Sequence, residues 1–313
     1  MFKYAIRRLL QTIPVLLGVT IITYFAIWLA PGDPIQTMLG MRATQEQIAE
    51  VKTHMGLDRP LIMQYITWLG NILRGDFGIS LQNNQPVLKL IAERIPATFQ
   101  LGMASFIISL IIGVFTGVIS AVKRNKPIDY IARFFSMLGV SMPVFWQGLM
   151  LILIFALYIP IFPASGRSPD PWSLDGLRYL VLPAVTLGTS TAASLSRLTR
   201  SSMLEVLRED YITTARAKGL VERTVIYKHG LRNALIPVVT ILGFRVGAIL
   251  GGSVITETVF AWPGMGRMTV RALIARDFPL ILGNVVLLAM LYVYANAIVD
   301  ILYAVIDPRI TYD

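Results

Sequence analysis

The sequence predicts an all-α integral membrane protein with six transmembrane helices, and three observations support this prediction. Of the 313 residues, 55% are apolar and 15% are charged, and the mean hydropathy of +0.65 lies outside the range of ordinary soluble proteins. Six stretches are apolar and long enough for helices that cross about 30 Å of hydrocarbon. Lysine and arginine gather in three short segments that flank these stretches. An even number of spans places both termini on the same side.

The six predicted spans carry no charged residue, with one exception. They are Leu9–Gly32, Ala97–Val122, Phe134–Gly166, Tyr179–Ser196, Asn233–Thr256 and Phe278–Val299. The third is expected to leave the membrane near Tyr158, and Arg245 interrupts the fifth. The first follows the basic segment KYAIRRLL but shows no small-residue cleavage site. Residues 1–32 are therefore interpreted as a retained signal anchor rather than as a cleaved signal peptide.

Positive charge sets the predicted orientation, because loops that stay in the cytoplasm are enriched in lysine and arginine. Three segments are basic in this way: the residues before the first span, those between the second and third, and those between the fourth and fifth. We therefore expect these segments and both termini to face the cytoplasm from a plasma (bacterial inner) membrane. The net charge of +10 then reflects topology, and nucleic acid is not an expected partner.

The largest predicted segment outside the membrane is the loop of residues 33–96, which we expect on the extracytoplasmic side. Within it, Ala43–Met55 is predicted to be helical because its apolar residues form one stripe and Thr44 is suited to cap it. Leu61–Leu73 and Val87–Arg94 are expected to form two more short helices, separated by turn-forming residues. The loop is thus expected to form a small helical cap.

The chain lacks the residue patterns of an enzyme. No Gly-x4-Gly-Lys-[Ser/Thr] motif is present, since none of the seven lysines follows a glycine. Cysteine is absent, and His54 and His229 are predicted to lie on opposite sides of the membrane, which excludes a histidine metal cluster and a histidine-paired nucleophile. We expect no catalytic residue, metal or cofactor in this chain. An ion-coupled carrier, the alternative class, would need acidic pairs inside the spans, and none is found.

Arg245 is the one charged residue inside a predicted span, where it costs at least about 2.5–3.5 kcal/mol. Gly243, Gly247 and Gly251 recur every four residues and form a stripe suited to close helix packing. Arg245 lies on the other side of the helix from Gly243 and Gly247. It either faces a translocation pathway or partner subunit, or is a structural arginine bonded to backbone carbonyl groups. The sequence does not distinguish the two.

The charged segment between the fourth and fifth predicted spans has the pattern of a short amphipathic helix. Four residues fall at helical spacing on one face: Leu204, Leu207, Tyr211 and Ala215. Gly219 is placed to end this helix with a left-handed cap, and a second helix is expected from Glu222 into the fifth span. A helix lying on lipid is the alternative, but it would favour bulky anchors. The small residues Ala215, Ala217 and Gly219 instead favour the close approach of another protein.

Nine short motifs follow one another in an order typical of a single family. They are PGDP (31–34), GLDRPL (56–61), GDFG (75–78), LPAVTLG (182–188), RLTRSSMLEVL (197–207), TARAKG (214–219), KHGLRNALIPV (228–238), ETVFAWPGMGR (257–267) and RDFP (276–279). Through this ordered set the chain resembles, over essentially its whole length, the inner-membrane permease subunits of ABC importers for dipeptides and oligopeptides. It is most similar to the permease chain that carries a large loop after its first span.

The resemblance implies the type I ABC importer permease fold, with a core transmembrane domain at 97–313 and a coupling loop at 197–232 that docks on an ATPase. The family's docking pattern reads Glu-Ala-Ala, three residues, Gly. Here Thr213 and Thr214 replace the first two residues, whereas Ala215 and Gly219 are kept. The residues implied to couple to the ATPase are Leu204, Leu207, Tyr211, Thr214, Ala215, Arg216, Ala217, Lys218 and Gly219.

The resemblance also implies partners and an alternating-access mechanism. The implied partners are a second homologous permease subunit forming a heterodimer, two ATP-binding subunits that hold ATP and Mg, an extracytoplasmic substrate-binding protein, a peptide substrate and the lipid bilayer. Asp76, Phe77 and Trp262 are candidate contacts with the binding protein, although Trp262 could instead anchor the chain at the membrane interface. The same machinery importing nickel complexes or glutathione is the alternative to peptide import.

Overall fold

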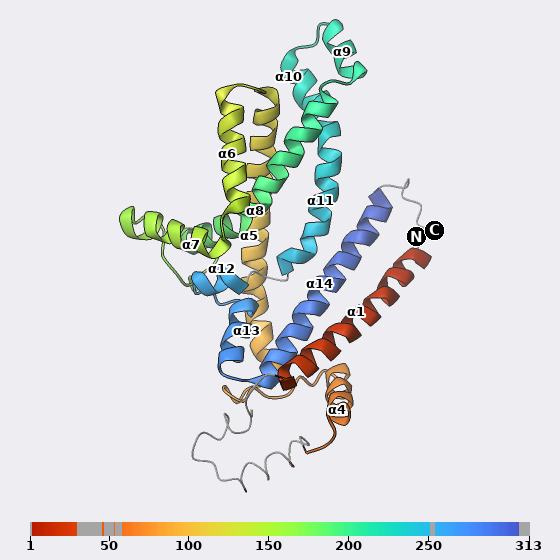
Figure 1. Cartoon of the computed structure of the whole chain (residues 1–313), viewed down its shortest axis with the longest axis vertical. Helices are drawn as coiled ribbons and strands as arrows, with labels where there is room; N and C mark the ends of the chain where they lie inside the picture. The colour runs from red at the N-terminus through yellow and green to blue at the C-terminus, as the bar shows by residue number, and fades with distance from the viewer. Residues whose placement is uncertain (1, 30–45, 47–52, 54–57, 251–253, 307–313) are drawn as a thin grey trace. The chain divides into compact units, whose positions relative to one another are not determined.

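The computed structural model of the chain (Figure 1) describes residues 2–29, 46, 53, 58–250 and 254–306, with the backbone alone at 2–6, 28, 243–250 and 300–306. The described residues are mostly helical, and their only β-type pairing is an isolated bridge between Ile79 and Pro86. The chain divides into two compact units. Unit 1 comprises Met1–Thr98 and Pro263–Asp313, and unit 2 comprises Phe99–Trp262.

Unit 1 is built around two long apolar helices, α1 (Phe2–Leu29) and α14 (Phe278–Ile306), which lie side by side (Figure 1). The helix α4 (Leu61–Leu73) packs on α1, where the ring of Tyr24 lies 5.5 Å from Tyr65 and 5.2 Å from Trp68 between centroids. The first turns of α5 (Val87–Val122) and the helix α13 (Met265–Ile274) complete the unit. Their buried residues share one core with the start of α14: Val87, Leu90, Ile91, Met265, Ala272, Leu280 and Ile281.

Unit 2 has the long helix α8 (Leu174–Val206) at its centre, packed against α6 (Pro127–Ser141), α7 (Val144–Ile152) and α11 (Arg232–Leu250). A π-helix, η1 (Leu153–Tyr158), continues α7, and α12 (Val254–Val259) packs on α7 and α8. Three further elements join α8 to α11: α9 (Asp210–Ala217), α10 (Glu222–Thr224) and the π-helix η2 (Val225–Leu231).

Glycines bring the backbones of α5 and α8 into direct contact within unit 2. A Cβ added to Gly113 would lie 2.8 Å from the carbonyl oxygen of Ala192, and one added to Gly117 would lie 2.6 Å from that of Ser196. On α8, a Cβ at Gly188 would lie 2.8 Å from the carbonyl oxygen of Ser105. Small residues are the usual means of close helix packing in membranes, where hydrophobic association of helices is weak.

Three helices of the described chain are long and apolar enough to cross a membrane. They contain Arg7–Ile27, Val87–Val122 and Phe278–Val299, and the bent pair Pro127–Ser141 and Val144–Tyr158 would make a fourth. The predicted helix Leu61–Leu73 is confirmed, and the apolar stretch of α14 has the predicted bounds. The mostly helical membrane protein is thus confirmed, whereas the count of six spans stays a prediction. The predicted helix Ala43–Met55 lies outside the described residues apart from 46 and 53.

The structure corrects the predicted third span, which is not one straight helix. α6 and the α7–η1 segment meet at 111°. Met142 has φ −77° and ψ 131°, an extended conformation, and Pro143 follows it. The proline ring disfavours the helical conformation of the residue before it, which explains why the helix breaks here.

A predicted break between two helices was also wrong. Val87–Arg94 and Ala97–Val122 form the single helix α5, with Pro96 inside it, because a proline removes one helical hydrogen bond and can still be accommodated. The predicted fourth span, Tyr179–Ser196, lies within a helix of 33 residues whose ends carry charged side chains, and its membrane boundaries stay a prediction.

Candidate functional site

The candidate site is the segment that links α8 to α11 in unit 2, and Figure 1 shows α9 and α10 beyond the ends of these two helices. The prediction of one continuous helix from Leu204 to Gly219 was wrong. α8 ends at Val206, a turn follows in which Glu209 N–H donates to the Val206 carbonyl at 3.1 Å, and α9 begins at Asp210. Acidic residues favour a helix N-terminus, which accounts for the new start at this position.

α9 buries one narrow face. Ile212 and Ala215, three residues apart, pack against Val225 of η2 and the partly buried Leu207. Leu204 lies partly buried in a neighbouring core with Met203 and Ile226. Of the predicted coupling residues, Ala215 therefore faces the interior of unit 2 and presents 8% of its surface. Its small side chain serves the approach of α9 to η2.

The predicted left-handed cap at Gly219 is confirmed. Gly219 has φ +75°, its N–H donates to the Arg216 carbonyl at 2.9 Å, and Leu220 N–H donates to the Ala215 carbonyl at 3.4 Å. Glycine enters this region without the steric penalty that a Cβ brings. A Cβ built on Gly219 would meet no atom within 4 Å, so the requirement for glycine within this chain comes from the backbone conformation alone.

An ion pair closes the turn after α9. The Arg216 guanidinium donates to the Glu222 carboxylate through Nη2 at 2.9 Å and Nε at 3.2 Å. The hydrogen bond from Arg216 lowers the pKa of Glu222, and the same bond raises the pKa of Arg216. Both side chains are largely exposed, so the pair contributes only about 0.2–1 kcal/mol. It fixes the direction of the turn more than it stabilises the fold.

Further contacts tie α9 and η2 to the long helices. Asn233 Nδ2 at the start of α11 donates to the Tyr211 hydroxyl at 2.7 Å and to the His229 carbonyl at 3.3 Å. Gly230 of η2 lies where a Cβ would be 3.2 Å from Leu207 Cδ2 and 3.8 Å from Met203 Cε. These contacts join α9 to the start of α11, and η2 to the end of α8.

The opposite side of α9 is open. We define its outer face by four exposed residues that no core cluster covers: Thr214 and Ala217 of α9, and Leu220 and Val221 in the turn that follows it. Val221 presents 72% of its surface and Leu220 presents 42%, so both aliphatic side chains are open to contact. Apolar side chains around small residues, with charged groups nearby, make a surface suited to another protein. Lys218 and Gly219 are also exposed at its edge.

Sequence reasoning missed a buried ionic cluster elsewhere in unit 2. Asp129, fully buried at the start of α6, accepts from Arg200 Nε and Nη2, both at 2.9 Å, from Ser120 Oγ at 2.5 Å and from Asn125 N–H at 3.0 Å. The cluster fixes the turn between α5 and α6 to the part of α8 that leads into α9. Arg200 lies 71 residues from Asp129, and nothing in the local pattern pairs them.

The other predicted site residues lie apart from α9. In unit 1, Asp76 is exposed and accepts from Gly78 N–H at 2.9 Å, while Phe77 is partly buried against the Val87 core. In unit 2, Trp262 is fully buried, with the Arg167 guanidinium 5.7 Å from its ring centroid, and Arg167 Nε donates to Gln100 Oε1 at 3.0 Å. A buried indole offers no surface for direct contact or for interfacial anchoring.

The predicted pathway and packing residues fall where the structure describes little. Gly243, Arg245 and Gly247 lie in α11, but their side-chain surroundings are outside the described residues. Gly251 lies outside them altogether. Both alternatives for Arg245 therefore stay open.

Comparisons with known proteins cover the whole chain. Residues 113–312 match the family described as "Binding-protein-dependent transport system inner membrane component", and residues 1–102 match the N-terminal part described for the same kind of component. The chain is 43% identical to the dipeptide transport system permease protein DppB of Alkalihalophilus pseudofirmus and 44% identical to the oligopeptide transport system permease protein AppB of Bacillus subtilis, covering 100% of both chains in each case. It is 40% identical to DppB of Escherichia coli, with 99% of each chain covered.

Proposed function

Since the chain belongs to the family of binding-protein-dependent transport system inner membrane components, we propose that it is the permease subunit of an ATP-driven importer of dipeptides or oligopeptides. The observation that supports this most strongly is 40–44% identity, over 99–100% of each chain, to permeases named for dipeptide and oligopeptide transport. The apolar helices α1, α5 and α14 agree with a protein embedded in the membrane.

The importer would use the type I permease arrangement of six spans with both termini in the cytoplasm. In this arrangement 1–32 contains the anchoring helix, 33–96 is the extracytoplasmic loop, and 97–313 is the core. A second homologous permease subunit would complete the pathway as a heterodimer, and two ATP-binding subunits would bind ATP and Mg. An extracytoplasmic binding protein would deliver the peptide, with Asp76 and Phe77 as candidate contacts. ATP hydrolysis would then reside in the partner chains.

We assign the outer face of α9 to contact with an ATP-binding subunit. Its exposed apolar and small side chains support this assignment, as do the contacts that join α9 to the ends of α8 and α11. When the ATP-binding subunits close, α9 would move with them and carry the ends of these helices along. ATP binding and hydrolysis in the ATP-binding subunits would thus move α8 and α11 of the permease.

The proposed function is tested by reconstitution in proteoliposomes. The chain, its second permease and its ATP-binding subunits are incorporated together, and uptake of radiolabelled dialanine is measured with ATP and the binding protein supplied. We expect uptake to stop when ATP, either permease or the binding protein is omitted. Uptake by this chain alone, driven by an ion gradient, would refute the proposal. Uptake of glutathione or a nickel complex in place of the peptide would refute the peptide assignment.

The ATPase contact has its own test in a matched pair of substitutions. Ala217 lies on the outer face of α9, and Ala92 is another exposed helical alanine, in unit 1. Ala217→Trp is expected to weaken binding of the ATP-binding subunits to the permease pair in detergent at least about tenfold, whereas Ala92→Trp leaves it unchanged. Equal binding by both variants would show that the outer face does not contact an ATP-binding subunit.

The role of Arg245 is resolved by Arg245→Met. Loss of uptake in a complex that assembles normally would support the pathway role. Loss of assembly would support the structural alternative. Both quantities are read from the same preparation, by subunit co-purification and by ATP-driven uptake.

A further inference from the structure

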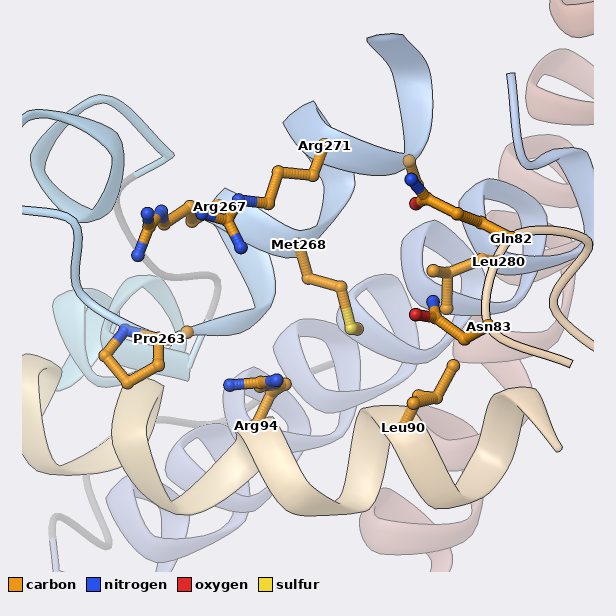
Figure 2. A pocket seen from close by; sticks show the side chains of 11 residues that line it. Gln82, Asn83, Leu90, Arg94, Pro263, Arg267, Met268, Arg271 and Leu280 are labelled. Atoms are coloured by element: carbon orange, nitrogen blue, oxygen red, sulfur yellow. The ribbon is translucent and has the colours of Figure 1, made fainter. Parts of the chain in front are cut away.

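Unit 1 contains a pocket of about 160 Å³ in which three arginines converge (Figure 2). We call it the arginine pocket and define it by Arg94 of α5, Arg267 and Arg271 of α13, and the amides of Gln82 and Asn83. Figure 2 shows the three arginines toward one side of the pocket, the two amides toward the other, and the Met268 side chain between them. Leu90, Ala272 and Leu280 supply apolar lining.

The lining of the arginine pocket is basic and contains no carboxylate. Neither Arg94 nor Arg271 forms an ion pair with any carboxylate among the described residues. Burial, with the charges of Arg271 and Arg94, lowers the pKa of the Arg267 guanidinium. Keeping like charges together costs free energy, and an anion bound between them would recover it.

A buried carboxylate of unit 1, Asp277, holds one wall of the pocket in place. Asp277 accepts from Ser80 Oγ, from Leu81 N–H at 3.1 Å and from Gln82 N–H at 3.3 Å, and it is 1% exposed. It therefore fixes the segment that carries Gln82 and Asn83 against the junction of α13 and α14. Asn83 Nδ2 also donates to Ser80 Oγ at 3.2 Å, so the backbone of this segment and the Asn83 amide are held in place before any ligand arrives, which lowers the cost of binding one.

The chemistry of the lining selects a carboxylate. Guanidinium groups bind carboxylates through pairs of parallel hydrogen bonds, and amide N–H groups can satisfy the remaining oxygen lone pairs. The volume of about 160 Å³ is smaller than the roughly 300–1,000 Å³ usual for small-molecule pockets, so it suits a terminal group better than a whole peptide. A small pocket fits a group at the end of a chain, whereas the phosphate of most membrane lipids is esterified on both sides. An Asp or Glu side chain is both a carboxylate and a terminal group.

The pocket lies at one end of the apolar helices. Arg94 precedes the uncharged stretch 97–122 by three residues, and Leu280 belongs to the first turn of α14. In the proposed orientation this end faces the extracytoplasmic side. We propose that the arginine pocket binds an acidic side chain of the extracytoplasmic binding protein when that protein docks. This inference rests on the proposed function, which supplies the binding protein as a partner.

The test measures the affinity of the binding protein for the complete importer in nanodiscs of zwitterionic phosphatidylcholine. Arg271→Gln is the main variant, because Arg271 is exposed and its loss leaves the core intact. We expect the Kd to rise at least about tenfold, with partial recovery in Arg271→Lys. The wild-type affinity should also fall as salt rises from about 50 to 300 mM. Arg178→Gln, which removes an exposed arginine outside the pocket, should leave the Kd unchanged.

Several outcomes separate this inference from the proposed function. If the wild-type complex binds no binding protein at all, the proposed function fails. If Arg271→Gln and Arg178→Gln bind it as tightly as the wild type does, the pocket inference alone fails. If binding is normal but Arg271→Gln no longer prefers a dipeptide with a free C-terminus over its amide, the pocket holds the substrate carboxylate instead. If phosphatidylglycerol stabilises the wild-type complex against unfolding but not Arg271→Gln, the pocket holds a lipid phosphate. Either of the last two results overturns the inference.

Discussion

Gly219 allows the coupling role of the turn after α9 to be separated from its role in folding. A side chain at φ +75° pays the left-handed penalty of about 1–2 kcal/mol, and asparagine pays less than most residues. Because a Cβ at Gly219 would meet no atom within 4 Å, no clash inside the chain adds to that cost. Native proteins are typically stable by about 5–15 kcal/mol, so Gly219→Asn and Gly219→Trp should both fold and insert.

The two variants should differ once the ATP-binding subunits are added. A tryptophan at the edge of the outer face would obstruct a close protein contact, and we expect a loss of at least about 2 kcal/mol, or roughly 30-fold in Kd. Gly219→Asn should lose less than about tenfold. Binding is measured by titrating labelled ATP-binding subunits into the detergent-solubilised permease pair, and uptake is measured in proteoliposomes. Normal binding and normal ATP-driven uptake by Gly219→Trp would refute the reasoning.

Three further predictions concern stability, each read from thermal unfolding followed by tryptophan fluorescence. Asp129→Ala should lower the free energy of unfolding by about 3 kcal/mol, the lower end for a broken buried pair because Arg200 keeps 21% exposure; an unchanged midpoint would contradict it. Gly117→Ala should destabilise by about 1–3 kcal/mol, whereas Gly70→Ala, with no atom within 4 Å, should stabilise by about 0.5–1 kcal/mol; shifts of the same sign would argue against the packing described. Glu222→Gln should cost at most about 1 kcal/mol at pH 7. Since the folded pKa of Glu222 is lowered, this difference is present above the unfolded pKa of about 4.3 and vanishes as pH falls through the folded pKa; a difference that grows with acid would be inconsistent with the ion pair.

The features predicted correctly from sequence are those set by neighbouring residues. The left-handed Gly219 follows from a glycine placed at the end of an amphipathic pattern, and Leu61–Leu73 follows from a short apolar run between turn residues. The apolar stretch Phe278–Val299 was predicted correctly because one uncharged run forms one helix. In each case the determinant is local in the chain.

The features that were missed depend on distant partners. An apolar run has the same sequence pattern whether its helix is straight or bent. The 111° break after Met142 was therefore not predicted, although Pro143 is a signal for it. Trp262 lies near a predicted membrane boundary and was interpreted as a surface residue, yet it is fully buried. Asp129 and Arg200 meet only because α6 and α8 pack together. Pairings of this kind are set by tertiary structure, which a single sequence does not reveal.

The backbone contact between α5 and α8 also constrains how the chain can be made. Gly113 and Gly117 are translated about 80 residues before Ala192 and Ser196, whose carbonyl oxygens they approach. At 5–20 residues per second, the ribosome takes roughly 4–16 s to cover that distance. During this interval α5 would lie in the membrane without α8, and only lipid tails would cover the surface at Gly113 and Gly117. Another helix with small side chains could pack against this surface before α8 is made. The order and speed of synthesis therefore affect whether the correct helices pair.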